Sequence, residues 1–187
     1  GDHGYLDELG HLHILDRQED VITNTDGEII YPRLVENELK SSPYIQEAVC
    51  FGKDKPYMTA ILNIDMNSVG RWADKNRILY TEYSDLSRNP KVVELIEQQV
   101  EQLMSKLSPQ NRVKKFSILH KQFTADQGEL TRTLKIRRNF VEQKYKILLD
   151  GMYSDTQEVS LTSSQMESVE EEVSLRVIQL KIEQGVA

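Results

Sequence analysis

The stretch GELTRTLKIRRNF, residues 128–140, places one lysine, Lys135, after two threonines and before two arginines. A lysine ammonium is a compact positive charge with three hydrogen-bond donors. It suits phosphate or carboxylate oxygens that gain negative charge during a reaction. The spacing predicts a loop that leads into a helix, with Lys135 at the junction. A solvated surface lysine is the alternative, because most lysines lie exposed.

The composition is that of a soluble globular protein, with 39% hydrophobic and 28% charged residues among 187. No apolar run approaches the ~18 residues that span a bilayer, and the acidic start contains no signal peptide. The lone Cys50 cannot form an internal disulfide, so we expect a reducing, cytoplasmic location. Because the chain begins at Gly1 rather than methionine, we expect either an excised piece of a longer protein or a processed product.

Charge is distributed unevenly around a net value of −7. Residues 1–31 hold eight acidic residues against one arginine, whereas residues 112–146 hold ten basic residues against three acidic ones. This basic block predicts a face that meets an anionic partner, either a small phosphorylated ligand or a nucleic acid. The small number of aromatic residues in the block argues against a nucleic-acid-binding module. Such a module would use Lys114, Lys115, Arg132, Lys135, Arg137 and Arg138.

The segments that must position Lys135 read as strands and helices in mixed order, which is typical of an α+β fold. Apolar–polar alternation on both sides of Glu8-Leu9-Gly10 predicts a β-hairpin. The pair Asp26-Gly27 predicts a second turn between two short strands. We therefore expect a small mixed sheet with an N-terminal β-hairpin, packed helices and an extended C-terminal tail.

One helix has the clearest amphipathic pattern, over residues 90–107. Pro90 suits its first turn, and either Ser87 or Asn89 can cap it. The apolar residues recur at a helical period, so this helix should pack on the core. The other predicted elements are helices over 32–42, 67–79 and 137–149, and strands over 45–51, 58–64 and 116–119.

The C-terminal tail, residues 154–187, is more polar than the rest of the chain. Its start, TQEVSLTSSQ, predicts a linker. The spacing from Ser168 to Glu171 is that of a capping box, so we predict a terminal helix. The alternation of Val173, Leu175 and Val177 would instead fit a strand. The predicted units are thus a junction hairpin (1–18), a domain (19–153) and this tail.

The first segment of the chain supports a catalytic role for Lys135. It carries Gly1-Asp2, Asp16-Arg17, Glu19-Asp20 and Gly27, and then Pro32 and Glu36 at the start of a helix. This order resembles the AMP-forming acyl-CoA synthetases of the acyl-adenylate-forming (AMP-binding) superfamily. The stretch around Lys135 resembles the T-x-T-x-K-x-(K/R)-R sequence that carries the catalytic lysine in the small C-terminal domain, or lid, of these enzymes. The resemblance extends from residue 1 to about residue 153.

The long helix and the ELT-x-TLK form resemble the long-chain fatty-acid branch of this family. The resemblance implies the lid of an ATP-dependent fatty acid–CoA ligase, with fatty acid, ATP and CoA as substrates. In the family, a large N-terminal adenylation domain holds the phosphate loop, the acyl pocket and the Mg²⁺ site. This sequence contains no Ser/Thr/Gly-rich phosphate loop, so that domain would be its partner. Association of the whole enzyme with a membrane surface, and its oligomeric state, stay open.

The resemblance also implies a role for each matching residue. Asp2 matches the acid that holds the ribose hydroxyls of the nucleotide, and Arg17 matches an arginine that touches ribose or phosphate. Glu19 falls on the hinge about which the lid rotates, with Asp20 as the alternative. The turn Thr25-Asp26-Gly27-Glu28 matches the loop that lines the pantetheine tunnel for CoA.

Lys135 matches the lysine that bridges the acyl carboxylate and the α-phosphate. Two of its neighbours depart from the family pattern: Arg132 stands where proline is usual, and Leu134 stands where many members have glycine. Simpler interpretations of the other matches are a turn aspartate for Asp2, a surface ion pair for Arg17 and an ordinary turn glycine for Gly27.

The implied mechanism forms acyl-AMP first and the thioester second, with the lid rotating between the two steps. One alternative is the lid of an acyl-AMP ligase that serves a carrier protein, because a carrier-bound pantetheine offers the same thiol. Another is an interaction module that works through the tail. The histidines His3, His11 and His13 lack a fixed fourth ligand, so we predict no metal site.

Overall fold

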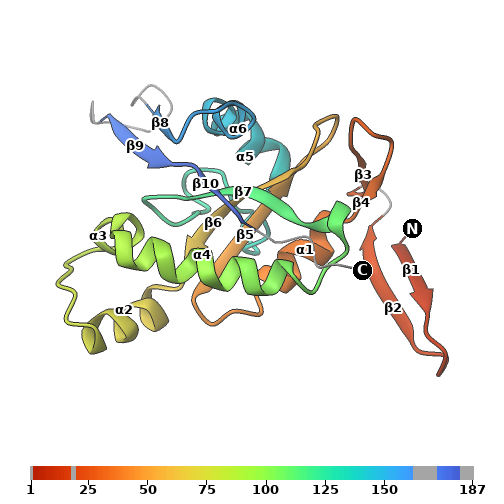
Figure 1. Ribbon diagram of the computed structural model, residues 1–187, viewed down its shortest axis with the longest axis horizontal. Helices are drawn as coiled ribbons and strands as arrows, with labels where there is room; N and C mark the ends of the chain where they lie inside the picture. Colours follow the sequence, from red (N-terminus) through yellow and green to blue (C-terminus); the bar gives the residue numbers. More distant parts are fainter. Residues whose placement is uncertain (1, 18–19, 162–171, 182–187) are drawn as a thin grey trace.

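The computed structural model describes residues 2–17, 20–161 and 172–181 (Figure 1). Its centre is a four-stranded sheet in the order β10-β7-β6-β5. Strands β5 (Ile45–Phe51) and β6 (Met58–Ile64) form an antiparallel pair with the bounds expected from the sequence. Strand β7 (Val113–Ile118) runs parallel to β6, and β10 (Ile178–Gln179) runs antiparallel to β7. The predicted α+β class is confirmed.

A crossover on one face of the sheet makes the parallel β6–β7 pairing possible, because parallel strands cannot be joined by a tight turn. It consists of α2 (Met66–Lys75), α3 (Tyr83–Arg88), α4 (Pro90–Met104) and the short 3₁₀ helix η1 (Pro109–Asn111). Helix α4 begins where predicted, and the Asn89 side chain caps it by accepting from the Lys91 N–H at 2.9 Å. Helix α1 (Pro32–Leu39) covers the same face beside α4.

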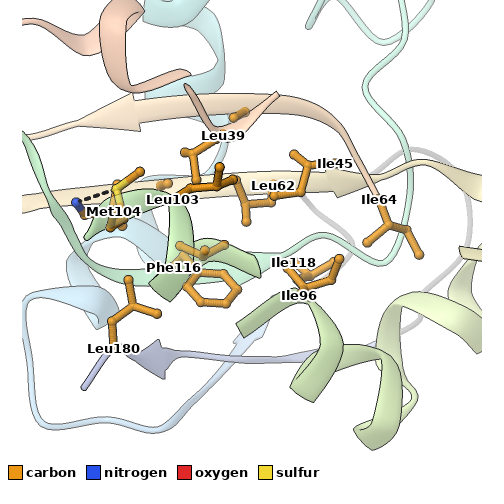
Figure 2. Close-up of a cluster of buried hydrophobic side chains, with 14 of the residues drawn as sticks. Leu39, Ile45, Leu62, Ile64, Ile96, Leu103, Met104, Phe116, Ile118 and Leu180 are labelled. Atoms are coloured by element: carbon orange, nitrogen blue, oxygen red, sulfur yellow. Dashed lines mark hydrogen bonds between the residues drawn. The ribbon is translucent and has the colours of Figure 1, made fainter. Parts of the chain in front are cut away.

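Two hydrophobic cores lie on the two faces of the sheet. Strand β5 contributes to both, because successive side chains of a strand point to opposite faces. Ala48 and Cys50 join the core under α1 and α4, part of which is drawn in Figure 2, whereas Val49 and Phe51 join the other core. That second core lies under α5 (Arg138–Lys144), α6 (Lys146–Met152), β8 (Glu158–Leu161) and β9 (Val173–Arg176).

The helix predicted over 137–149 is divided in two at Tyr145, whose ψ of 24° departs from the helical value. The Tyr145 ring is buried at 1% exposure, and its hydroxyl donates to Glu129 at 2.6 Å. A tertiary contact therefore interrupts a segment that the local pattern favours as continuous.

The tail is where the sequence predictions fail. The predicted linker contains β8, which pairs with β9, and the predicted helix is wrong over residues 173–179, where β9 and β10 lie. The capping-box residues 168–171 lie outside the described part of the chain. Val173, Leu175 and Val177 are 8%, 2% and 8% exposed, so their two-residue period packs one face of a strand onto the core.

The predicted N-terminal hairpin is present as β1 (Asp2–Leu6) and β2 (Leu12–Arg17). The register shifts between His3 and Gly4, where a Cβ on Gly4 would lie 2.5 Å from the His13 carbonyl oxygen. A second short pair, β3 (Ile22–Thr23) and β4 (Ile29–Ile30), precedes α1. No helix among the described residues is both long and apolar enough to cross a bilayer.

His120, which follows β7, gives the domain a specific response to acid. Burial, together with the nearby cations Lys121 and Arg88, lowers the pKa of its imidazole from an ordinary 6.5 to about 4, while Glu129 opposes them. Because the unfolded chain binds a proton at His120 more readily, protonation favours unfolding. The contribution of neutral His120 to the free energy of unfolding is therefore complete above about pH 6.5 and is lost as the pH falls toward 4. We expect wild type to lose about 2 kcal/mol more stability than His120→Gln over that range, a value reduced for partial exposure.

Chemical denaturation at pH 7.5 and pH 4.5 measures this difference between the two proteins. His11→Gln is the matched control, because the His11 side chain is 70% exposed. An unchanged difference between wild type and His120→Gln at the two pH values would contradict the assignment.

Candidate functional site

Lys135 directly follows a tight turn, residues 131–134, between β7 and α5, in which the Leu134 N–H donates to the Thr131 carbonyl at 2.9 Å. Leu130 and Ile136 pair across the base of this turn as an isolated β-bridge. The Thr131 N–H donates to the Lys135 carbonyl at 2.8 Å, and the Lys135 N–H donates to Thr131 Oγ1 at 3.1 Å. Both backbone polar groups of Lys135 are therefore fixed, while its side chain is exposed.

The spacing of the motif follows from this geometry. Thr131 closes the turn, and its hydroxyl also makes a 3.0 Å hydrogen bond with that of Thr133. Leu134 has a φ of +58°, in the left-handed region that favours glycine, and its side chain is exposed. The turn thus explains why a glycine is suited to this position and shows that leucine preserves the turn at a cost of about 1 kcal/mol.

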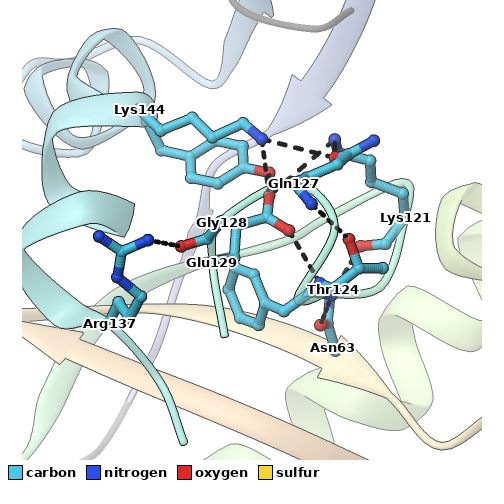
Figure 3. A network of polar contacts seen from close by, with 10 residues as sticks. Asn63, Lys121, Thr124, Gln127, Gly128, Glu129, Arg137 and Lys144 are labelled. Carbon is cyan, nitrogen blue, oxygen red and sulfur yellow. Dashed lines mark hydrogen bonds and ion pairs between the residues drawn. The ribbon is translucent and has the colours of Figure 1, made fainter. Parts of the chain in front are cut away.

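Glu129 anchors the first side of the turn from a fully buried position (Figure 3). It accepts from the Tyr145 hydroxyl at 2.6 Å and from the Thr124 N–H at 2.9 Å, and it pairs with Lys144 Nζ at 3.1 Å. Burial raises the pKa of the Tyr145 hydroxyl, and its bond to Glu129 raises it further, so this group remains a donor. The Arg137 N–H donates to the Glu129 carbonyl at 2.9 Å and ties the two sides together.

Arg138 anchors the second side. Its guanidinium forms a two-pronged ion pair with Glu36 of α1 and donates to the Cys50 carbonyl at 2.7 Å. Arg138 was a candidate for phosphate binding in the nucleic-acid hypothesis, but its Nη1 and Nη2 groups already donate to Glu36 and Cys50, and its Nε is buried. Sequence reasoning placed Glu36 in a motif without assigning its partner, which lies 102 residues away.

The second candidate turn, residues 24–28, is organised by Asn24. The Asn24 side-chain oxygen accepts from the N–H groups of Asp26 and Glu28, at 3.0 and 2.9 Å. Gly27 has a φ of +79°, and nothing lies within 4 Å of the place where its Cβ would be. Glycine is therefore needed for the backbone and not for space. Asn24 was missed from the sequence, although asparagine preceding Asp-Gly is itself a turn signal.

A cleft of about 390 Å³ adjoins this turn. Its lining combines the acidic turn with cations, and it includes Asp26, Glu28, Tyr57, Arg112, Lys114 and Lys115. Arg137 and Arg138 line a different cleft, together with Asp20 and Phe140. The basic block of the sequence is thus divided between two places, which argues against a single nucleic-acid face.

The remaining candidates lie at the N-terminal end. Asp2 and Arg17 are direct cross-strand partners in the β1–β2 hairpin, so their backbones are adjacent; their side chains fall outside the described part. Of the two hinge candidates, Glu19 lies outside the described residues, and Asp20 lines the cleft beside Arg138. Across the described side chains, no group of three or more His, Cys, Asp or Glu residues could hold a metal ion.

The fold and the two turns define the C-terminal domain of an AMP-binding enzyme. The family model described as "AMP-binding enzyme C-terminal domain" matches residues 19–157, and the chain belongs to this family. The resemblance inferred from the two motifs is confirmed.

Individual relatives narrow the class. The chain is 32% identical over 155 residues to the long-chain-fatty-acid–CoA ligase FadD15 of Mycobacterium tuberculosis, covering 82% of this chain and 26% of that protein. It is 30% identical over 171 residues to the human long-chain-fatty-acid–CoA ligase ACSBG2, with 82% and 26% coverage. The chain therefore spans about a quarter of the length of these relatives, and it is similar to the C-terminal domain of fatty-acid–CoA ligases.

The fold also recurs in solved structures. The adenylation domain of a carboxylate reductase from Mycobacterium chelonae superposes with a TM-score of 0.61 at 21% identity, covering 80% of this chain and 24% of that one. The corresponding domain from Segniliparus rugosus, in complex with AMP and a carboxylic acid, gives a TM-score of 0.62 at 18% identity, with 82% and 22% coverage. These similarities concern the fold.

Proposed function

We propose that this chain is the C-terminal lid of an ATP-dependent, long-chain fatty acid–CoA ligase, in which the two turns serve different half-reactions. In the first, a fatty-acid carboxylate attacks the α-phosphorus of ATP and gives acyl-AMP and pyrophosphate. In the second, the CoA thiol attacks the acyl carbonyl and gives acyl-CoA and AMP. Rotation of the lid about Glu19–Asp20 exchanges the Lys135 turn for the 25–28 turn at the reacting atoms.

The main support for this proposal is the way in which the domain fixes the backbone of Lys135 and exposes its side chain. Its backbone is fixed at both polar groups, and its side chain is exposed directly after the turn. A preorganised positive charge stabilises the negative charge that develops at a phosphoryl centre without reorganising during the reaction. Relatives named as long-chain fatty-acid–CoA ligases support fatty acid, ATP and CoA as the substrates.

The proposed partner is the N-terminal adenylation domain of the same protein, which would supply the ATP, Mg²⁺ and acyl sites. The β1–β2 hairpin supports this proposal, because one of its faces is apolar and uncovered. Leu6 and Leu12 pair across the strands, Ile14 lies on the same side, and their exposures are 67%, 67% and 60%. A contiguous apolar face of this kind is typical of a surface that another domain covers.

Fatty-acid-dependent release of pyrophosphate from ATP by the full-length protein, without CoA, tests the proposal. We expect pyrophosphate and bound acyl-AMP, followed by thioester when CoA is added. Supplying a pantetheine-bearing carrier protein in place of CoA tests the alternative acceptor. Absence of pyrophosphate release with every fatty acid would contradict the proposed function.

The variant Gly27→Asn is expected to impair thioester formation and to leave acyl-AMP formation intact. Asparagine tolerates the left-handed backbone, so the turn persists, but its side chain now enters the proposed pantetheine tunnel. We expect thioester formation to fall about tenfold, with pyrophosphate release unchanged. Gly10→Asn controls for the backbone cost, because Gly10 has a φ of +81° and equal free space. Equal loss in both half-reactions would contradict a role for this turn in CoA binding.

A further inference from the structure

A buried ion pair links the two motifs of the sequence, although neither motif suggests the link by itself. Glu36 comes from the helix that follows the 25–28 turn, and Arg138 is the first residue of α5, three positions after Lys135. Arg138 Nη2 donates to Glu36 Oε2 at 3.0 Å, and Nη1 donates to the other carboxylate oxygen. The side chains of Glu36 and Arg138 are 11% and 23% exposed.

The backbone of β5 completes the arrangement. The Cys50 N–H donates to Glu36 Oε1 at 2.8 Å, and the Cys50 carbonyl accepts from Arg138 Nη1 at 2.7 Å. The pair is therefore fixed to β5, an edge strand of the four-stranded sheet, whose residues from Ala48 to Phe51 are all buried. Arg138 cannot shift along α1 or β5 without breaking charge-assisted hydrogen bonds on both.

This anchor acts on Lys135 through two intervening residues. Ile136 bridges to Leu130, and the Arg137 N–H donates to the Glu129 carbonyl at 2.9 Å. The second side of the turn is therefore set between Arg138 at its end and Glu129 across from it. Among the described residues, the Lys135 side chain makes no hydrogen bond, ion pair or ring contact, so its position depends on this backbone.

We propose that Glu36 and Arg138 are positioning residues for adenylation, which hold the Lys135 turn at a fixed place relative to the central sheet. The inference rests on the proposed function and deepens it. A buried ion pair adds little net stability compared with apolar side chains of the same size, but its geometry is directional. The position of a catalytic charge such as the Lys135 ammonium must be held closely, because a displacement of about 1 Å from the reacting atoms can lower the rate about 100-fold.

The test uses the full-length protein with Glu36→Gln, Lys135→Ala and the double variant. Pyrophosphate release from fatty acid and ATP is measured separately from thioester formation with supplied acyl-AMP and CoA. We expect Glu36→Gln to lower kcat of the first reaction about 10- to 100-fold, with little change in KM and less than about threefold change in the second reaction. In the Lys135→Ala background, Glu36→Gln should have no further effect on the first reaction.

Glu38→Gln is the matched control. Glu38 lies on the same helix, and its ion pair with Lys106 joins two side chains that are 28% and 58% exposed. We expect both half-reactions of this variant to match wild type. An equal loss from Glu38→Gln and Glu36→Gln would overturn the proposal, because the effect would then belong to the helix charge in general.

Glu36→Gln leaves a buried guanidinium without its counter-ion and can weaken the fold. Glu36→Gln/Arg138→Met removes that charge, while the amide oxygen at position 36 can still accept from the Cys50 N–H. We expect this variant to regain the melting temperature of wild type and still to adenylate slowly. Recovery of adenylation together with stability would overturn the proposal and leave the pair a purely structural role. If Lys135→Ala itself adenylates normally, the proposed function fails instead.

Discussion

Replacing Lys135 with alanine in the full-length protein is expected to slow acyl-AMP formation by about 10²- to 10³-fold. Truncation removes the exposed ammonium that follows the turn and leaves the hydrogen bonds between Thr131 and the Lys135 backbone in place. The expected loss is therefore confined to the stabilisation of charge during attack on the α-phosphorus. Stability should change by less than about 0.5 kcal/mol, because the side chain is exposed.

The same variant should form thioester from supplied acyl-AMP and CoA at a rate close to that of wild type. Rapid-quench measurement of each half-reaction gives the two rates separately. Arg132→Ala is the matched control, because Arg132 is an exposed cation in the same turn. If Arg132→Ala and Lys135→Ala are equally impaired, the general positive charge of the turn matters and Lys135 has no special role.

Ending the chain after Gln157, where the family match ends, is expected to unfold the domain. The deletion removes β8, β9 and β10 and leaves β7 as an unpaired edge. It also strips six buried side chains from the two cores. At about 1.5–3 kcal/mol each, their loss is about 9–18 kcal/mol, which equals or exceeds the whole stability of a typical domain. The six are Val159, Leu161, Val173, Leu175, Val177 and Leu180.

Circular dichroism and thermal unfolding of the shortened chain test this expectation. A chain that ends after Lys181 is the control, because it keeps every described strand. We expect cooperative unfolding from the control and none from the chain that ends at Gln157. A cooperative transition at the same temperature in both would show that the tail is dispensable.

Local patterns predicted much of the fold. The bounds of β5 and β6 follow from two apolar runs separated by a polar turn, and α4 follows from its helical period and its Asn89 cap. The break at Tyr145 could not be predicted, because its partner Glu129 lies 16 residues away in the turn before the helix. The tail was misjudged because a capping-box spacing was given more weight than the strand alternation of Val173, Leu175 and Val177.

For the candidate site too, the sequence could predict some residues and not others. Lys135 and Gly27 could be singled out because each lies in a short motif whose spacing is local. The groups that hold Lys135 could not, because the Glu36–Arg138 pair joins residues that are 102 positions apart. A tertiary fold is needed to show that the carboxylate of one motif fixes the arginine of the other.

The most direct test of the central claim is identification of the products that the full-length protein makes from a long-chain fatty acid, ATP and CoA. We expect acyl-CoA, AMP and pyrophosphate in equal amounts, and no thioester from residues 1–187 alone. Formation of ADP and phosphate, or of acyl-CoA by residues 1–187 alone, would contradict this expectation.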